Sequence, residues 1–196
     1  MARALRALFL LFLLAGCGGS PAPEYKGSDI TGADFGNRLA LTDHNGRSVS
    51  LDSFRGRLVV VFFGYTHCPD VCPTTLSDMA QAMKLMAPDL AAKVQVLFVS
   101  VDPERDTSET LKAYVPYFHP DFLGLRGSAE EVAAAAKEFR VVYRKHMAPG
   151  ATGYLVDHSA GSYVLDRAGR LRLYLPYAHP PAAIAHDLTT LAAAGE

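Results

Sequence analysis

Residues 58–73 have the sequence LVVVFFGYTHCPDVCP, in which an unbroken apolar run leads into a pair of cysteines. The apolar run does not alternate with polar residues, which indicates a strand buried on both faces, as in the middle of a sheet. Gly64 ends this strand, and Pro73 suits the first turn of a helix, where its missing N–H would have no partner. Cys68 and Cys72 therefore lie where a central strand passes into a helix.

The position of the two cysteines favours their thiolate forms. Unpaired N–H groups and the positive end of the dipole stabilise negative charge at a helix N-terminus. A thiolate is both a better metal ligand and a readier partner in disulfide exchange. In a helical turn, the spacing of Cys68 and Cys72 places their Cα atoms about 6 Å apart, within the range of a disulfide. From the residues alone, the pair can bind a soft metal, exchange disulfides or form a structural disulfide.

The composition fits one globular domain. The chain has 196 residues, of which 49% are hydrophobic and 20% charged, enough for a substantial core. Its formal net charge is −1, and it becomes more negative without Arg3 and Arg6 near the N-terminus. Because nucleic-acid binding depends on clustered positive charge, we expect no nucleic-acid partner.

The first segment predicts export. Arg3 and Arg6 accompany an apolar run over residues 8–14 that is too short to span a bilayer comfortably, and the sequence LAGC that ends at Cys17 is similar to a bacterial lipobox. We expect a lipoprotein signal peptide over residues 1–16, a lipid-modified Cys17, a flexible tether over 17–33 and the folded domain over 34–196. The lipid anchor would hold the domain at the outer face of the cytoplasmic membrane or in the periplasm. Cys68 and Cys72 would then be the only free thiols.

Hydrophobic periodicity, capping signals and turn residues predict the remaining elements. The expected strands cover residues 38–42, 48–51, 58–63, 94–101, 122–125, 140–145, 163–166 and 170–175. The expected helices cover residues 74–86, 106–118 with Asp106 as the cap, 128–139 and 181–193, and residues 147–153 form a loop.

The order of these elements indicates an α/β fold with a mixed central sheet flanked by helices. The first two strands, joined through Asn45-Gly46, are expected to form an N-terminal β-hairpin. In such a sheet, sites lie beyond the carboxyl ends of the central strands. Cys68, Cys72 and Asp102 all follow strand ends of this kind.

Three blocks of the chain resemble one known family. Residues 63–76, FGYTHCPDVCPTTL, are closely similar to the signature of the Sco/SenC copper proteins. Residues 100–107, SVDPERDT, and residues 156–159, VDHS, are similar to two later segments of that family, in the same order. The resemblance spans residues 35–191. It implies a thioredoxin-like fold and the delivery of copper to the binuclear copper (CuA) centre of cytochrome c oxidase subunit II.

The resemblance also implies the ligands and partners. Cys68 and Cys72 match the thiolate ligands of the family, and His158 matches its imidazole ligand, for copper as Cu(I), Cu(II) or both. Spacing alone does not select His158 among the seven histidines. The expected partners are cytochrome c oxidase subunit II and either another periplasmic copper chaperone or a thiol reductant, and we expect a monomer. Two soft sulfur ligands and one imidazole suit copper, and they fall short of the four ligands usual for structural zinc.

The leading hypothesis is therefore a membrane-tethered copper chaperone that is not an enzyme. The alternative is a thiol-disulfide oxidoreductase, in which Cys68 and Cys72 are the catalytic dithiol that reduces the cysteines of the copper acceptor. A third reading is passive copper buffering. The sequence leaves two roles open: His67 is either a ligand or a local electrostatic influence, and Asp102 either orients the site or only ends its strand.

Overall fold

A computed structural model describes residues 23–147 and 153–193, and it has the expected mixed α/β architecture. Its main sheet has eight strands in the order β1-β10-β9-β4-β5-β6-β2-β3. The bounds are β1 (Ser28–Asp29), β2 (Ala40–Asp43), β3 (Ser48–Ser50), β4 (Leu58–Gly64), β5 (Val94–Ser100), β6 (Leu123–Arg126), β9 (Ser162–Leu165) and β10 (Leu171–Leu175). A separate sheet of two strands contains β7 (Tyr143–Met147) and β8 (Tyr154–His158). The helices are η1 (Leu51–Phe54), α2 (Val71–Leu85), α3 (Pro88–Ala91), α4 (Ser108–Phe118), α5 (Ala129–Glu138) and α6 (Pro181–Ala193).

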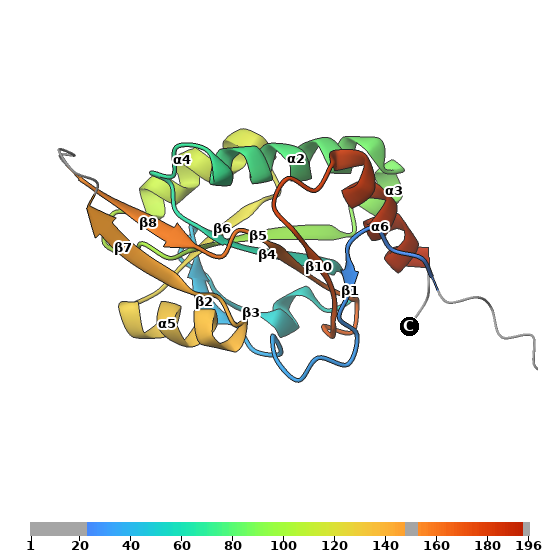
Figure 1. Ribbon diagram of the computed structural model, residues 1–196, viewed down its shortest axis with the longest axis horizontal. Coiled ribbons are helices and arrows are strands. Elements are labelled where there is room, and N and C mark those ends of the chain that lie inside the picture. Colours follow the sequence, from blue (N-terminus) through green and yellow to red (C-terminus); the bar gives the residue numbers. More distant parts are fainter. Residues whose placement is uncertain (1–22, 148–152, 194–196) are drawn as a thin grey trace, which may run out of the picture.

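The central strand is β4, as its sequence predicts. All seven of its residues are buried, because the strand is paired on both edges and covered on both faces. It runs parallel to β5 and antiparallel to β9. Helices α2 and α4 lie over one face of the sheet and α5 lies over the other (Figure 1). The carboxyl end of β4 therefore meets the start of α2 at an edge of this layered core.

Several expected elements are confirmed. The N-terminal hairpin pairs β2 with β3, and Gly46 in its turn has the positive φ of 82° that suits glycine. The late hairpin pairs β9 with β10. At the start of α5, the Ser128 side chain accepts from the Glu131 N–H, and the Glu131 side chain accepts from the Ser128 N–H. This is the capping box that the sequence predicts.

The prediction that Asp106 caps α4 is wrong. The cap is Thr107, whose side-chain oxygen accepts a hydrogen bond of 3.2 Å from the N–H of Thr110. Asp106 is instead fully buried. Two neighbouring polar residues could each fill the cap position, and the chain uses the second while the first points inward.

The pairing around His158 also differs from the prediction. The expected strand over residues 140–145 begins only at Tyr143, and it does not join the main sheet. It pairs with β8, a strand that the sequence did not indicate, and the two project together from the main body (Figure 1). His158 is the last residue of β8. Most of the loop expected over residues 147–153 lies outside the described residues.

Part of the segment expected as a tether over residues 17–33 packs against the domain. The N–H groups of Lys26 and Gly27 each donate a hydrogen bond of 2.7 Å to the carboxylate of Asp187 on α6. Ser28 and Asp29 then pair with β10 as an edge strand. These residues therefore belong to the domain, although their polar sequence carries no signal of burial.

The signal peptide predicted over residues 1–16 and the predicted lipidation site Cys17 lie outside the described residues. Within the ranges that the structure covers, no helix combines the length and apolar character needed to cross a bilayer.

Candidate metal centre

The two cysteines lie at the turn between β4 and α2, as expected. Cys68 is partly exposed in the turn, where its N–H donates to the carbonyl oxygen of Tyr65 at 3.2 Å. Cys72 is fully buried in the first turn of α2. Gly64 makes room for it, because a Cβ atom at that position would lie 2.7 Å from the Cys72 Sγ atom. The end of the central strand therefore fixes the position of the Cys72 sulfur, which is the inner, buried sulfur of the pair.

The two thiols are coupled to each other and are not joined by a disulfide in this structure. A hydrogen bond from the Cys72 thiol lowers the pKa of Cys68 to about 5, with help from the N–H groups of Asp70 and Cys72. The N–H of Cys72 lies 3.4 Å from the Cys68 Sγ atom. The same hydrogen bond, together with burial, raises the pKa of Cys72. The pair therefore holds one outer thiolate and one inner thiol.

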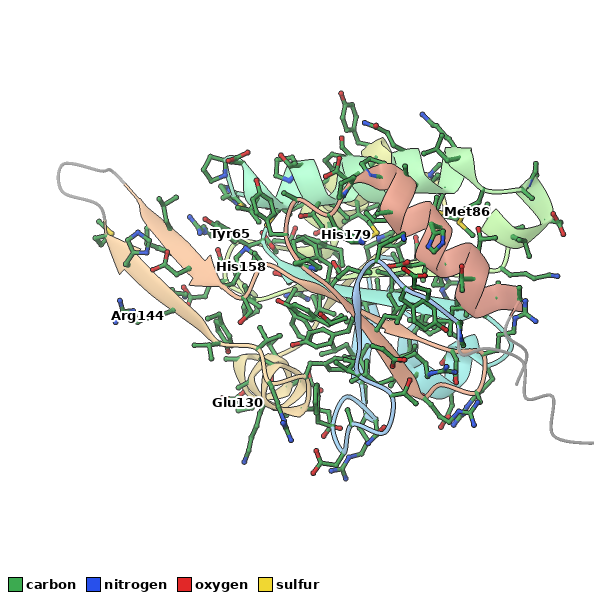
Figure 2. All side chains as sticks on the ribbon, turned by 45° about the vertical axis from the view of Figure 1, so that its right-hand side comes forward. Tyr65, Met86, Glu130, Arg144, His158 and His179 are labelled. Atoms are coloured by element: carbon green, nitrogen blue, oxygen red, sulfur yellow. The ribbon has the colours of Figure 1, made fainter. Side chains whose placement is uncertain are left out.

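His158 converges on this pair from β8. Its Nε2 atom lies 3.4 Å from the Cys72 Sγ atom, and its Nδ1 atom lies 3.1 Å from the carbonyl oxygen of Ser159. An Nδ1–H donated to that carbonyl leaves the lone pair on Nε2 directed toward the sulfur. The ring lies edge-on to Tyr65, with centroids 6.0 Å apart, and Figure 2 shows the two side chains next to each other.

Cys68, Cys72 and His158 together form the kind of cluster that binds a metal ion. One ligand atom from each lies within 4.8 Å of the others. Within the described parts of the chain, no fourth histidine, cysteine or acidic residue joins them. Two sulfur atoms and one imidazole suit a soft metal such as Cu(I), whereas structural zinc usually has four protein ligands. The structure thus brings together the three residues expected as ligands, and their ligation itself stays a prediction.

Asp102 links the main body to the strand that carries His158. It is fully buried after β5, and it accepts a hydrogen bond of 2.7 Å from the hydroxyl of Tyr154 at the start of β8. It also forms an ion pair with Arg105. The sequence left open whether Asp102 orients the site or only ends its strand. These contacts are those of a residue that orients the site.

Asp106 is a site-supporting residue whose position the sequence did not indicate. Its buried carboxylate accepts from the Thr66 N–H at 3.1 Å, from the Thr66 hydroxyl at 2.6 Å and from the Ser100 hydroxyl at 2.6 Å. Thr66 lies in the turn before Cys68. Asp106 therefore holds this turn against the end of β5. The only hint in the sequence is its place in the block that resembles the Sco/SenC family.

His67 is not part of the cluster. Its side chain is 52% exposed, and its Nδ1 atom lies 3.1 Å from the Thr66 hydroxyl and 3.9 Å from Asp106. This position fits the electrostatic role and not the ligand role that the sequence left open. The other histidines also lie outside the cluster, namely His44, His119, His146, His179 and His186. Of these, His44 is a buried structural residue whose Nδ1 accepts from the N–H of Gly124.

Comparison with known proteins agrees with the geometry of this site. Residues 27–193 match the family described as SCO1/SenC. The chain belongs to this family. A protein from Bos taurus named "Protein SCO2 homolog, mitochondrial" is 43% identical over 132 residues, which cover 67% of this chain and 50% of that protein. The chain spans about half the length of the mammalian relatives that it matches.

Solved structures of SCO1/SenC proteins are similar over most of the chain. A structure of Bradyrhizobium japonicum ScoI with copper bound has 41% identity and a TM-score of 0.72, covering 79% of this chain and 98% of that one. A SCO1/SenC family lipoprotein from Bacillus anthracis has 25% identity and a TM-score of 0.70, covering 86% and 99%. Because the Sco structures are thioredoxin-like, the predicted fold class is confirmed.

Proposed function

We propose that this SCO1/SenC protein binds one copper ion through Cys68, Cys72 and His158. The observation that carries the proposal is the convergence of the three ligand atoms within 4.8 Å. The bound copper in the related Bradyrhizobium japonicum structure supports the choice of metal. The outer thiolate can bind the ion first, and the inner thiol then loses its proton as it becomes a ligand.

The copper is cargo, and we propose that the protein delivers it to the CuA centre of cytochrome c oxidase subunit II. Three protein ligands leave a coordination position through which a ligand of the acceptor can attack. Cys68 is partly exposed, so the acceptor can reach the outer sulfur while Cys72 still holds the ion from within. Copper would pass by stepwise ligand exchange, without free copper in solution.

The location follows from the predicted N-terminal segment. Export through residues 1–16 and lipidation of Cys17 would tether the domain to the outer face of the cytoplasmic membrane or in the periplasm. The family lipoprotein from Bacillus anthracis supports this arrangement. Tethering would keep the protein on the same membrane surface as its acceptor.

The low pKa of Cys68 favours a second candidate function, reduction of the acceptor's disulfide. The Cys68 thiolate would attack one sulfur of that disulfide, which forms a mixed disulfide and releases one acceptor thiolate. Cys72 would then lose its proton and attack Cys68, which releases the second acceptor thiolate and leaves Cys68 and Cys72 oxidised. Here the acceptor gains two electrons, and His158 is not required.

A transfer experiment separates the two candidates. The full-length reduced protein, loaded with one equivalent of Cu(I) or Cu(II), is mixed with the reduced, metal-free CuA domain of subunit II. After the two proteins are separated, we expect the copper to be found on the CuA domain with the wild type and with the His146→Ala control, but not with the His158→Ala variant. If the wild type keeps its copper, yet both variants reduce an oxidised CuA domain, the oxidoreductase function is the correct one.

A further inference from the structure

The strand that carries His158 does not belong to the main sheet. Strands β7 and β8 pair only with each other among the described residues, and a two-stranded sheet alone is marginally stable in water. The position of His158 relative to the two sulfurs therefore depends on what docks β8 against the main body.

Alternate residues of β8 make this contact. Side chains two residues apart share one face of a strand, so Tyr154, Val156 and His158 lie on the same face. Tyr154 donates to Asp102, and the Val156 side chain is buried in the core. His158 contacts Cys72. The strand is thus held at three successive points, of which the metal ligand is the last.

Arg105 is the side chain that joins these points. Its guanidinium carbon lies 3.7 Å from the centroid of the Tyr154 ring, and its Nη1 donates a hydrogen bond of 2.9 Å to the Tyr154 carbonyl oxygen. Its Nε donates to Asp102, the same carboxylate that accepts from Tyr154. The guanidinium also lies 5.6 Å from the centroid of Tyr65, whose ring packs edge-on against His158.

We propose that Arg105 is a positioning residue that sets the copper affinity by holding β8 where His158 reaches Cys72. Its hydrogen bonds and ring contacts are with Asp102, Tyr154 and Tyr65, so it acts on the ligands through these residues. The planar shape of the guanidinium matters more than its charge, because Lys145 already lies 4.0 Å from Asp102. A lysine at position 105 would keep the charge but lose the flat stacking surface and the fork of donors.

The inference rests on copper binding as proposed above, and does not depend on delivery to cytochrome c oxidase. A double-mutant cycle tests it, with Arg105→Lys, His158→Ala and the double variant in the full-length reduced protein. Copper affinity is measured by competition with a chelator of known affinity. We expect Arg105→Lys to weaken binding about 10-fold, as for residues that orient metal ligands. In the His158→Ala background the same change is expected to cost less than about 2-fold, because residues that act through one contact are not additive.

Arg140→Lys is the matched control. Arg140 also stacks on an aromatic ring, 4.2 Å from the centroid of Phe35, and it donates to Asp34 at 2.7 Å. It has no contact with β8 among these interactions. This control is expected to leave copper affinity unchanged.

Hydrogen exchange on the metal-free protein gives a second readout. In Arg105→Lys, the amides of β8 are expected to exchange faster than in the wild type, while the amides of β4 exchange at the wild-type rate. The reduction potential of the Cys68 and Cys72 pair is also expected to stay at the wild-type value. An unchanged copper affinity in Arg105→Lys would overturn the inference, as would an equal loss in the presence and absence of His158. If the wild type binds no copper, the proposed function fails instead.

Discussion

The Sγ atom of Cys72 and the Nε2 atom of His158 lie 3.4 Å apart, although 86 positions separate the two residues in the chain. Cys72 belongs to the helix that follows the central strand, and His158 ends a strand outside the main sheet. The candidate metal centre therefore exists only where the projecting hairpin is docked on the core.

Replacement of His158 by alanine is expected to weaken copper binding by about 10-fold to 100-fold, since even residues that only support a ligand have effects of this size. Chelator competition on the reduced protein measures the change. His146→Ala is the control, because His146 lies on the same hairpin but outside the cluster. A wild-type affinity for His158→Ala would exclude this histidine as a ligand. Thiol-disulfide exchange is expected to survive in both variants.

The two cysteines are expected to differ in reactivity. Because Cys68 has a pKa of about 5 and is partly exposed, iodoacetamide should alkylate it first, with a rate that rises around pH 5 and is level at neutral pH. In Cys72→Ala the main hydrogen bond that lowers the Cys68 pKa is lost, so the midpoint moves upward toward the ordinary value of 9.0. Mass spectrometry of peptides after timed alkylation gives both rates. Faster labelling of Cys72 in the wild type would contradict the assignment of the outer thiolate.

Copper affinity is expected to rise with pH. Above the pKa of Cys68 that sulfur is already a thiolate, whereas the raised pKa of Cys72 keeps its proton at neutral pH. Copper must displace this proton, so the apparent affinity rises by about tenfold per pH unit between roughly pH 6 and 8. A chelator titration repeated across this range measures the slope. A flat profile would mean that Cys72 is not a ligand or is already ionised.

Asp106→Asn is expected to destabilise the domain by about 3 kcal/mol, because the buried carboxylate accepts from both groups of Thr66 and from Ser100. An amide offers only one acceptor oxygen in its place. Urea unfolding measures the difference in the free energy of unfolding. The exposed Asp121 supplies the control, since Asp121→Asn is expected to change stability by no more than about 0.5 kcal/mol. If Asp106→Asn and Asp121→Asn destabilised the domain equally, Asp106 would not be a residue that supports the turn.

Gly64→Ala is expected to disrupt the site and destabilise the fold by about 1 to 3 kcal/mol. The added Cβ atom would lie 2.7 Å from the Cys72 Sγ atom and 2.8 Å from the Phe98 ring, so Cys72 or the strand must shift. Copper affinity and urea unfolding both report on this shift. A Cβ atom at Gly153 meets no atom within 4 Å, so Gly153→Ala is the neutral control. Wild-type copper binding in Gly64→Ala would show that the inner sulfur is less constrained than its packing indicates.

The core could be predicted from the sequence because burial leaves a strong pattern in it. The unbroken apolar runs of β4 and β5 identify central strands, and both are buried along their whole lengths. The turn after β4 could likewise be placed, since Gly64 and Pro73 mark its two ends. These local signals locate Cys68 and Cys72 without any other information.

The projecting hairpin could not be predicted, because its pattern is weak. Residues 143–147, YRKHM, are mostly polar and are partly or fully exposed, and their pairing depends on backbone hydrogen bonds to β8. Nothing in the periodicity connects His158 to the cysteines, and only the family resemblance selected it. The edge strand β1 has only Ser28 and Asp29, and it was missed for the same reason. Asp106 was misplaced because sequence does not tell which of two adjacent polar residues faces inward.

The separation of β7 and β8 from the main sheet divides the site into a sulfur half on β4 and α2 and an imidazole half on the projecting hairpin. Changes in the sulfur half are constrained by the close packing of β4 and α2. In the imidazole half, the residues of β7 and β8 are exposed or half-buried apart from Val156, so changes there disturb little of the core. Substitutions in this hairpin can therefore tune how tightly the site retains a metal without disturbing the packing that fixes Cys72.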